Sequence, residues 1–110
     1  TSITGPYTYL HSIDREIVVG ERCAIAPQTS MITSGHNRFV KPKSFSSGGE
    51  KTEGPIMIGD DVWLGAGSIV VGDCQIMDNV SVGAGSVLLA KTYGPNTFYA
   101  GVPAVEKSPL

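Results

Sequence analysis

The strongest constraint on the fold of this chain is a sequence repeat with a period of six residues. From Ile58 onward the chain divides into the consecutive blocks IGDDVW, LGAGSI, VVGDCQ, IMDNVS, VGAGSV and LLAKTY. Each block opens with an aliphatic residue, namely Ile58, Leu64, Val70, Ile76, Val82 and Leu88. Each fifth position is small or β-branched, namely Val62, Ser68, Cys74, Val80, Ser86 and Thr92. An earlier stretch follows the same rule, with blocks that open at Ile13, Val19, Ile25 and Met31.

A period of six excludes the two common amphipathic patterns, because a helix repeats about every 3.6 residues and a strand about every two. Six residues suit a short strand and a turn that together form one flat face of a triangular coil. The opening aliphatic and the fifth residue then point inward, and stacked coils bury a continuous apolar column. A glycine follows the aliphatic residue at Gly59, Gly65 and Gly83, where a corner needs positive φ or close backbone approach. The repeat therefore predicts an all-β, parallel β-helix.

The phase of the repeat also predicts how the chain is organised. We expect one domain over residues 1–110, with coils at about 13–36 and 58–93, a loop at 37–55 and a C-terminal tail at 94–110 that crosses back over the coils. The first dozen residues fit a degenerate coil around Ile3 and Tyr7. The loop is polar, rich in Gly and Ser, and out of phase with the repeat. Long loops inside small domains commonly have a function, so we expect this one to contribute to a site.

Composition excludes several classes of function. With 41% hydrophobic residues and a net charge of −2, the chain does not fit a disordered protein or one that binds nucleic acid. No apolar run reaches the length of a membrane span and no signal-peptide pattern is present, so we expect no membrane partner and a cytoplasmic location. The chain begins with Thr1, which leaves a processed chain or a fragment open. Cys23 and Cys74 occupy inward positions of the repeat and are expected to be reduced core thiols.

Three stretches together resemble a known family. They are VVGERCAIAPQTSMITSGHNRF (18–39), the block from Ile58 that reads IGDDVWLGAGSIVVGDCQI and continues with DNVSVGAGSVL, and AGVPA (100–104). The chain resembles the hexapeptide-repeat acetyltransferases, in the branch of the xenobiotic, galactoside and maltose O-acetyltransferases. The resemblance implies a left-handed parallel β-helix. It also implies transfer of an acetyl group from acetyl-CoA to a hydroxyl of a small acceptor, such as a sugar or a hydroxylated antibiotic.

The same resemblance assigns a catalytic role to His36, which follows Ser34 and Gly35 in the motif SGHNR. A histidine at the mouth of the family's loop acts as general base on the acceptor hydroxyl. Imidazole is suited to that role because its pKa lies near neutrality. Direct attack on the thioester then requires no acyl-enzyme, only a donor for the developing oxyanion. His11 has no such context and is expected to be a surface or turn histidine.

The resemblance also implies which residues bind coenzyme A. They are Trp63, which the repeat directs outward, beside the CoA arm; Ala66 and Ala84, along the pantetheine; Lys91, at the phosphates; and Pro103, on the adenine side. The chain departs from the family after AGVPA, where Val105 and Glu106 stand in place of the usual basic residue. The chain is also shorter than typical members at its N-terminus.

Relatives of this kind are trimers with active sites between subunits, so the resemblance implies a homotrimer. A zinc carbonic anhydrase on the same helix would need three histidine ligands, whereas the chain has only His11 and His36, and no metal is expected. Two alternatives stay open: a non-catalytic or truncated β-helix module, and a nucleotide-sugar N-acetyltransferase. Phe39 and Phe45 could stack on a ring, but the sequence does not identify the acceptor.

Overall fold

The computed structural model describes residues 2–3, 9–11, 15–36 and 51–110, and they form three faces of short strands. Face A contains β1 (Ser2–Ile3), β4 (Ala24–Ile25), β9 (Trp63–Leu64), β12 (Val80–Val82), β15 (Thr97–Gly101) and β16 (Ala104–Pro109), in that spatial order. Face B contains β2 (Tyr9–His11), β5 (Ser30–Ile32), β10 (Ile69–Val71) and β13 (Val87–Leu88). Face C contains β3 (Ile17–Val19), β8 (Ile56–Ile58), β11 (Cys74–Ile76) and β14 (Thr92–Tyr93).

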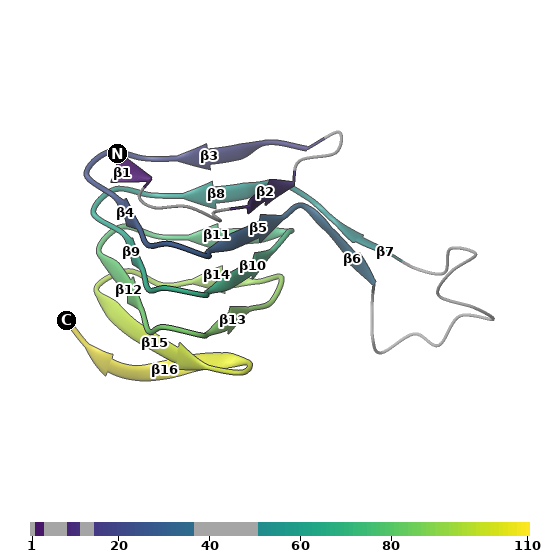
Figure 1. The fold of residues 1–110 in the computed structure, drawn as a ribbon. Helices are drawn as coiled ribbons and strands as arrows, with labels where there is room; N and C mark the ends of the chain where they lie inside the picture. Colours follow the sequence, from purple (N-terminus) through teal and green to yellow (C-terminus); the bar gives the residue numbers. More distant parts are fainter. Residues whose placement is uncertain (1, 4–8, 12–14, 37–50) are drawn as a thin grey trace.

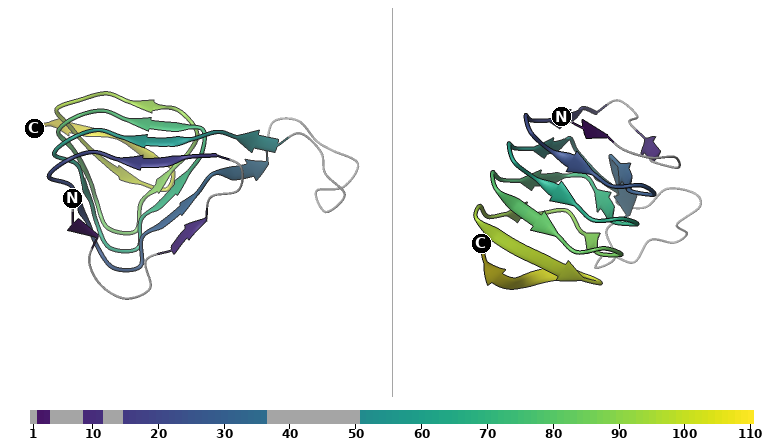
Figure 2. Two further views of the ribbon diagram at one scale, coloured as in Figure 1. Left: turned by 90° about the horizontal axis from the view of Figure 1, so that it is seen from above. Right: turned by 60° about the vertical axis from the view of Figure 1, so that its left-hand side comes forward.

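The chain visits faces A, B and C in turn, and each circuit forms one coil of a triangular prism (Figures 1 and 2). Strands of successive coils pair in parallel, so that Ile25 lies beside Leu64 and Leu64 beside Val82. The predicted left-handed parallel β-helix is confirmed, and the described residues include no α-helix. In that part of the chain, accordingly, no helix is long and apolar enough to span a bilayer.

The core is the column of inward residues that the repeat predicts. Leu64, Val70, Val82 and Leu88 have no exposed side-chain surface, and Ile76 is 1% exposed. Each such aliphatic side chain contributes about 1.5–3 kcal/mol when buried. The small fifth positions Ser68 and Ser86 also point inward, and their hydroxyls are satisfied locally. Ser86 Oγ, for example, donates to the carbonyl oxygen of Gly83 at 2.6 Å. A buried hydroxyl therefore keeps a partner without interrupting the apolar column.

Both cysteines are free and buried, as the sequence predicts. The Cys23 Sγ lies 3.1 Å from the carbonyl oxygen of Gly59. Burial raises the pKa of the Cys74 thiol to about 12, so this thiol is protonated at neutral pH. A protonated, buried thiol is a poor nucleophile, which fits a packing role for Cys74.

The last block of the repeat departs from the prediction. Thr92 was expected to point inward but is exposed, whereas Tyr93 is 1% exposed and pairs with Ile76. The step from Leu88 to Tyr93 is one residue shorter than the others, which moves Tyr93 into the position of an opening aliphatic. Its ring packs edge-to-face on Tyr99 at 5.1 Å, and its hydroxyl donates to the carbonyl oxygen of Leu89 at 3.0 Å. A large ring with a satisfied hydroxyl thus fills the last coil.

The two reasons offered for the corner glycines apply to different residues. Positive φ occurs two residues later than expected, at Gly67 (73°) and Gly85 (71°), and not at Gly65. Gly65 is required for close approach, because a Cβ there would lie 2.6 Å from the backbone nitrogen of Ala84. At Gly59 a Cβ would collide with the Asp78 carboxylate.

The excursion begins where the chain passes from face B to face C. β6 (Ser34–His36) and β7 (Lys51–Glu53) form an antiparallel ribbon that extends away from the prism (Figure 1). Residues 37–50, with Phe39 and Phe45, lie outside the described part of the chain. The tail differs from the expected crossing, because β15 first adds a parallel strand beside β12. β16 then turns back antiparallel to β15 and pairs with it.

Candidate active site

The three corners of the prism differ in composition, and the predicted site residues lie on two of them. The A–B corner consists of Ala66, Gly67, Ala84 and Gly85, with Pro27 and Gln28 in the coil before. The B–C corner consists of Thr33, Gly54, Gly72, Asp73, Ala90 and Lys91. The C–A corner consists of Glu21, Arg22, Asp60, Asp61, Asp78, Asn79 and Asn96.

His36 lies at the outer end of β6, beyond the B–C corner. Its backbone pairs with that of Lys51, and its side chain lies outside the described part of the structure. The base of this ribbon is tied to the prism, since the backbone nitrogen of Gly54 donates to the Thr33 carbonyl at 3.1 Å. A Cβ on Gly54 would collide with the Asp73 side chain, so the returning strand packs closely on the coil below. The ribbon is therefore anchored where it leaves the β-helix.

Lys91 lies on the same B–C corner, in the last coil. It is exposed, and its Nζ lies 4.9 Å from the centre of the Tyr93 ring, close enough for a cation–π contact. The Lys91 carbonyl accepts a hydrogen bond from the backbone nitrogen of Gln75 at 3.0 Å. The side chain thus rests on the coil, with its charge open to solvent and to an anionic ligand.

Ala66 and Ala84 stack on each other at the A–B corner. The backbone nitrogen of Gly85 donates to the Ala66 carbonyl at 2.8 Å, and both alanines are exposed. A Cβ placed on Gly85 would meet no atom within 4 Å, so the surface here is open. Pro103 follows at the turn between β15 and β16, where Gly101 is tied to this edge by a hydrogen bond from its nitrogen to Ser86 Oγ at 3.2 Å. A narrow, flexible molecule could lie against this edge without meeting a large side chain.

Trp63 points outward from face A and is 47% exposed, as the phase of the repeat predicts. Its neighbours in the ladder are Ala24 and Ser81, both small. Packing within the described part of the chain therefore does not explain the exposed indole. It belongs to the strand that runs into the A–B corner, three residues before Ala66.

One chain does not bring all the predicted residues together. Ala66, Ala84 and Pro103 lie at one edge of face B, whereas Lys91 and the ribbon that ends in His36 lie at the other edge. The two edges are separated by strands such as β10, and three residues of strand extend about 10 Å. The predicted base and the predicted pantetheine contacts therefore occupy opposite sides of the same face.

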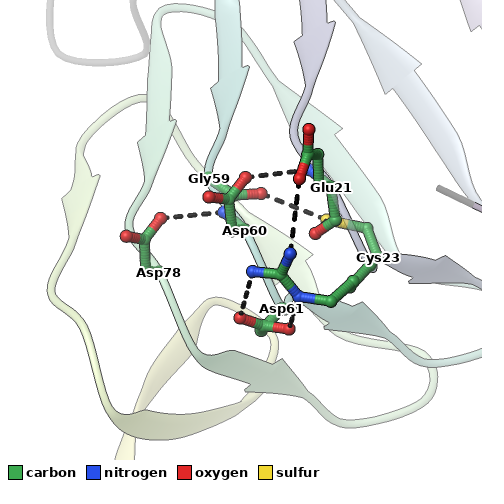
Figure 3. Close-up of polar contacts among 7 residues, drawn as sticks. Glu21, Cys23, Gly59, Asp60, Asp61 and Asp78 are labelled. Carbon is green, nitrogen blue, oxygen red and sulfur yellow. Dashed lines mark hydrogen bonds and ion pairs between the residues drawn. The ribbon is translucent and has the colours of Figure 1, made fainter.

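The C–A corner contains a hydrogen-bonded ladder that the sequence analysis did not single out (Figure 3). The Asp60 carboxylate accepts a hydrogen bond from the Glu21 nitrogen at 2.8 Å, and the Asp78 carboxylate accepts one from the Asp60 nitrogen at 2.8 Å. Arg22 donates to both Asp61 oxygens, at 2.8 and 3.1 Å. This bond holds the pKa of Asp61 below its ordinary value. The signal in the sequence is an acidic residue just after the aliphatic-glycine pair, in IGDD, and at the matching place in IMDN.

These carboxylates do not form a metal site. Within the described ranges, no three or more His, Cys, Asp or Glu side chains gather as potential ligands. A surface depression of about 260 Å³ lies nearby on face C, lined in part by Met57, Gln75, Met77 and Asp78. It includes none of the predicted site residues.

Comparison with known proteins identifies the repeat. Residues 55–90 match the family described as bacterial transferase hexapeptide (six repeats). These residues, about a third of the chain, carry the bacterial transferase hexapeptide repeat. The predicted resemblance to the hexapeptide-repeat acetyltransferases is confirmed. The residues matched by the family model include Trp63, Ala66 and Ala84.

Solved structures of acyltransferases are similar to this chain. A maltose O-acetyltransferase from Clostridium difficile 630 is 26% identical with a TM-score of 0.68, over 99% of this chain and 64% of that protein. A hexapeptide-repeat acetyltransferase from Vibrio cholerae O1 biovar eltor, in complex with acetyl coenzyme A, is 24% identical with a TM-score of 0.74, over 96% and 62% of the two chains.

A variant of AntD, an N-acyltransferase from Bacillus cereus, in complex with dTDP-4-amino-4,6-dideoxyglucose and coenzyme A, has a TM-score of 0.77 at 21% identity. That match covers 94% of this chain and 57% of AntD. The hexapeptide-repeat chain thus spans about 57–64% of the length of these proteins.

Proposed function

We propose that this hexapeptide-repeat chain is an acetyltransferase that moves the acetyl group of acetyl-CoA to a hydroxyl of a small acceptor, such as a sugar or a hydroxylated antibiotic. One observation supports this proposal most strongly. At the A–B corner of the hexapeptide β-helix, small exposed residues lie beside an exposed tryptophan. Ala66, Ala84 and Trp63 are all exposed on consecutive parts of this edge. The similar structures from Vibrio cholerae and Bacillus cereus hold acetyl-CoA or CoA, which supports CoA as the co-substrate here.

In the proposed complex the pantetheine arm runs along Ala66 and Ala84, with Trp63 beside it. Exposed methyl groups and open backbone allow a thin chain to approach closely, which larger side chains would prevent. Pro103 supports the adenine, and Lys91 of a neighbouring chain supplies a positive charge for the phosphates, because the Lys91 of the same chain lies at the other edge of face B. Val105 and Glu106 are exposed on β16 after Pro103 and add no cation there. We therefore expect the adenine end to contribute less to affinity than the pantetheine.

His36 is proposed as the general base. It takes the proton from the acceptor hydroxyl as the oxygen attacks the thioester carbonyl carbon. The new carbon–oxygen bond gives a tetrahedral oxyanion, whose collapse breaks the carbon–sulfur bond. The leaving CoA thiolate then receives the proton from the imidazolium, so the products are the acetyl ester and CoA. The step forms no covalent bond to the protein. The high pKa of the Cys74 thiol agrees with such a mechanism.

We propose a homotrimer in which active sites form between subunits. The separation of the two predicted half-sites across face B supports this, because a neighbouring chain could supply the half that is missing. We also propose that the enzyme works in the cytoplasm, because acetyl-CoA is supplied there.

The test is acetyl-CoA-dependent thiol release over a panel of sugars, hydroxylated antibiotics and amino sugar nucleotides, with CoA binding measured in parallel by calorimetry. We expect release with a hydroxyl acceptor, and a loss of about 100-fold or more in turnover in His36→Ala with CoA still bound. His11→Ala, which removes the other histidine, is the matched control and should stay active.

Three results would contradict the proposal. Release with amino acceptors alone would indicate an N-acetyltransferase. Full activity of His36→Ala would remove the proposed base. Absence of both release and CoA binding at millimolar ligand would indicate a non-catalytic β-helix module.

A further inference from the structure

Two aromatic side chains stand on the outer side of face A, on either side of a small residue. Trp63 of β9 pairs with Ser81 of β12, and Ser81 pairs with Phe98 of β15. These three strands follow one another along face A (Figure 1). Each of the three residues lies between two buried ones, so all three side chains point outward. Trp63 and Phe98 are therefore the walls of a gap that has Ser81 at its base.

Gly83 extends the base of this gap toward the A–B corner. A Cβ on Gly83 would lie 3.4 Å from Phe98 Cζ, so the Phe98 ring extends from β15 to the glycine in the coil before it. Gly83 directly precedes Ala84, which lies on the edge that the pantetheine is proposed to follow. The gap between the two rings is thus continuous with the proposed CoA site.

The width of the gap fits one planar ring. Neighbouring strands lie about 4.8 Å apart, so residues two strands apart on one face are separated by about 9.6 Å. A ring midway between Trp63 and Phe98 would lie about 4.8 Å from each, within the range of distances at which aromatic rings stack. Two flat walls at this spacing favour a flat ligand over a branched one.

Packing among the described residues does not require either ring at this surface. The last coil is already filled by Tyr93 and Tyr99, whose rings pack edge-to-face. The outward column of face C contains no ring, since it consists of Val18, Met57, Gln75 and Thr92. Among the strands whose side chains the structure describes, two outward rings that flank a small residue occur on face A alone.

We propose that Trp63 and Phe98 form an aromatic slot that binds the planar base of a nucleotide. Stacking on aromatic walls attracts a base without the help of a cation. This suits the tail of the chain, where Val105 and Glu106 follow shortly after Pro103 and carry no positive charge.

The base has two possible sources. The adenine of CoA is one, because Phe98 lies on the strand that leads to Pro103, on the proposed adenine side. The base of a nucleotide-sugar acceptor is the other. The assignment to adenine rests on the proposed function, whereas the slot itself rests on the positions of the two rings.

The experiment is a fluorescence titration of the whole chain, which is specific because Trp63 is its only tryptophan. The ligands are adenosine 3′,5′-bisphosphate, which is the nucleotide part of CoA, uridine 5′-diphosphate, and phosphopantetheine, which has no base. A base stacked on the indole should quench the fluorescence of wild type. Phe98→Leu keeps an apolar side chain over Gly83 but removes the flat wall, and it should raise the Kd of the bound nucleotide about fivefold or more.

Two variants serve as controls. Phe98→Tyr keeps the ring and should bind the nucleotide within about twofold of wild type. Met57→Ala removes a side chain that is 39% exposed on face C, away from the slot, and it should not change the Kd. Far-UV circular dichroism establishes that each variant is folded. If Phe98→Leu does not fold, Ser81→Phe takes its place, because a ring at the base would fill the slot and should abolish the quenching.

The two nucleotides distinguish the sources of the base. A loss of affinity for adenosine 3′,5′-bisphosphate in Phe98→Leu would assign the slot to the adenine of CoA. A loss for uridine 5′-diphosphate alone would assign it to a nucleotide acceptor. The proposal is overturned if neither nucleotide quenches Trp63 at millimolar concentration, or if a folded Phe98→Leu variant binds both as wild type does. It is also overturned if phosphopantetheine shows the same dependence on Phe98.

The titration uses no acetyl group and measures no turnover, so it is independent of the proposed activity. A protein that binds a nucleotide through Phe98 but releases no thiol would retain the slot and lose the proposed function. An active protein whose affinity for both nucleotides is unchanged in Phe98→Leu would retain the function and lose the slot.

Discussion

The A–B and C–A corners both turn the chain through left-handed backbone, but the side chains at the A–B corner are mostly small and those at the C–A corner are polar. Both turn through left-handed residues: Gln28, Gly67 and Gly85 at the A–B corner, and Arg22, Asp61, Asn79 and Asn96 at the C–A corner. At the C–A corner, side chains bind the backbone and one another, as in the bond from Asn79 Nδ2 to Asn96 Oδ1 at 2.9 Å. At the A–B corner, glycine and alanine leave the edge open. One corner is closed by bonds between its side chains, and the other is open to solvent.

This comparison also explains which residue types each corner accepts. Asn and Asp tolerate left-handed backbone because their short polar side chains bond locally. Glycine tolerates it with no side chain at all. The C–A corner therefore tolerates larger polar side chains, whereas the A–B corner stays open only if its side chains are small. The following predictions test that difference, from the largest expected effect to the smallest.

The largest effect is expected for Gly65→Ala at the A–B corner. The new methyl would lie 2.6 Å from the nitrogen of Ala84 and 2.8 Å from the carbonyl oxygen of Val82, and backbone atoms in a coil cannot move aside. Overpacking of this kind should lower the free energy of unfolding by about 3 kcal/mol, measured by urea unfolding. Gly85→Ala is the control, because it meets no atom within 4 Å and has only its positive φ to oppose it. We expect about 1–2 kcal/mol there. Equal losses at both glycines would show that backbone crowding does not hold this corner.

The second prediction concerns the open surface. Ala66→Phe should weaken CoA binding by tenfold or more, about 1.4 kcal/mol, because the ring would cover the edge along which the pantetheine is proposed to lie. Stability should change little, since Ala66 is exposed. Calorimetric titration with CoA and thermal unfolding measure the two effects. Gln75→Phe adds the same ring at an exposed position on face C, and it should bind CoA normally. Unchanged CoA affinity in Ala66→Phe would place the pantetheine elsewhere.

The smallest effect is expected at the C–A corner, in its dependence on pH. Because the bond from Arg22 lowers the pKa of Asp61 below its ordinary 3.8, the folded state favours the ionised carboxylate. The resulting stabilisation is present above about pH 4 and is lost as the pH falls through the lower pKa of the folded state. Arg22→Ala should therefore be slightly less stable than wild type at pH 7, and the difference should vanish in acid. Both groups are largely exposed, so salt should reduce it as well.

Thermal unfolding as a function of pH measures this difference. Lys107→Ala, which removes an exposed cation on β16, is the control and should show no such trend. A difference between wild type and Arg22→Ala that persists undiminished at the most acidic pH would mean that Arg22 acts through packing and not through Asp61.

The sequence alone determined the fold and most of its core. A period of six leaves one regular solution, because inward aliphatic and small residues must recur once per face, and Leu64, Val70 and Val82 are buried as that phase requires. Trp63 is exposed for the same reason. The prediction failed at Thr92, where a shortened step places Tyr93 inside. The inward and outward positions are counted forward from the previous block, so a block that is one residue short shifts the assignment of every later position.

Only the tertiary structure decided how the site residues are distributed. The spacing of a repeat fixes which face a residue lies on, and the path of the chain then fixes which corner ends up beside which. His36 and Lys91 are far apart in the sequence but share the B–C corner, whereas Ala66 and Ala84 lie across face B from them. The acidic ladder at the C–A corner likewise depends on the tertiary structure, although its carboxylates recur in the sequence. Its hydrogen bonds join residues 18 or 39 positions apart, which become neighbours only when one coil is stacked on the next.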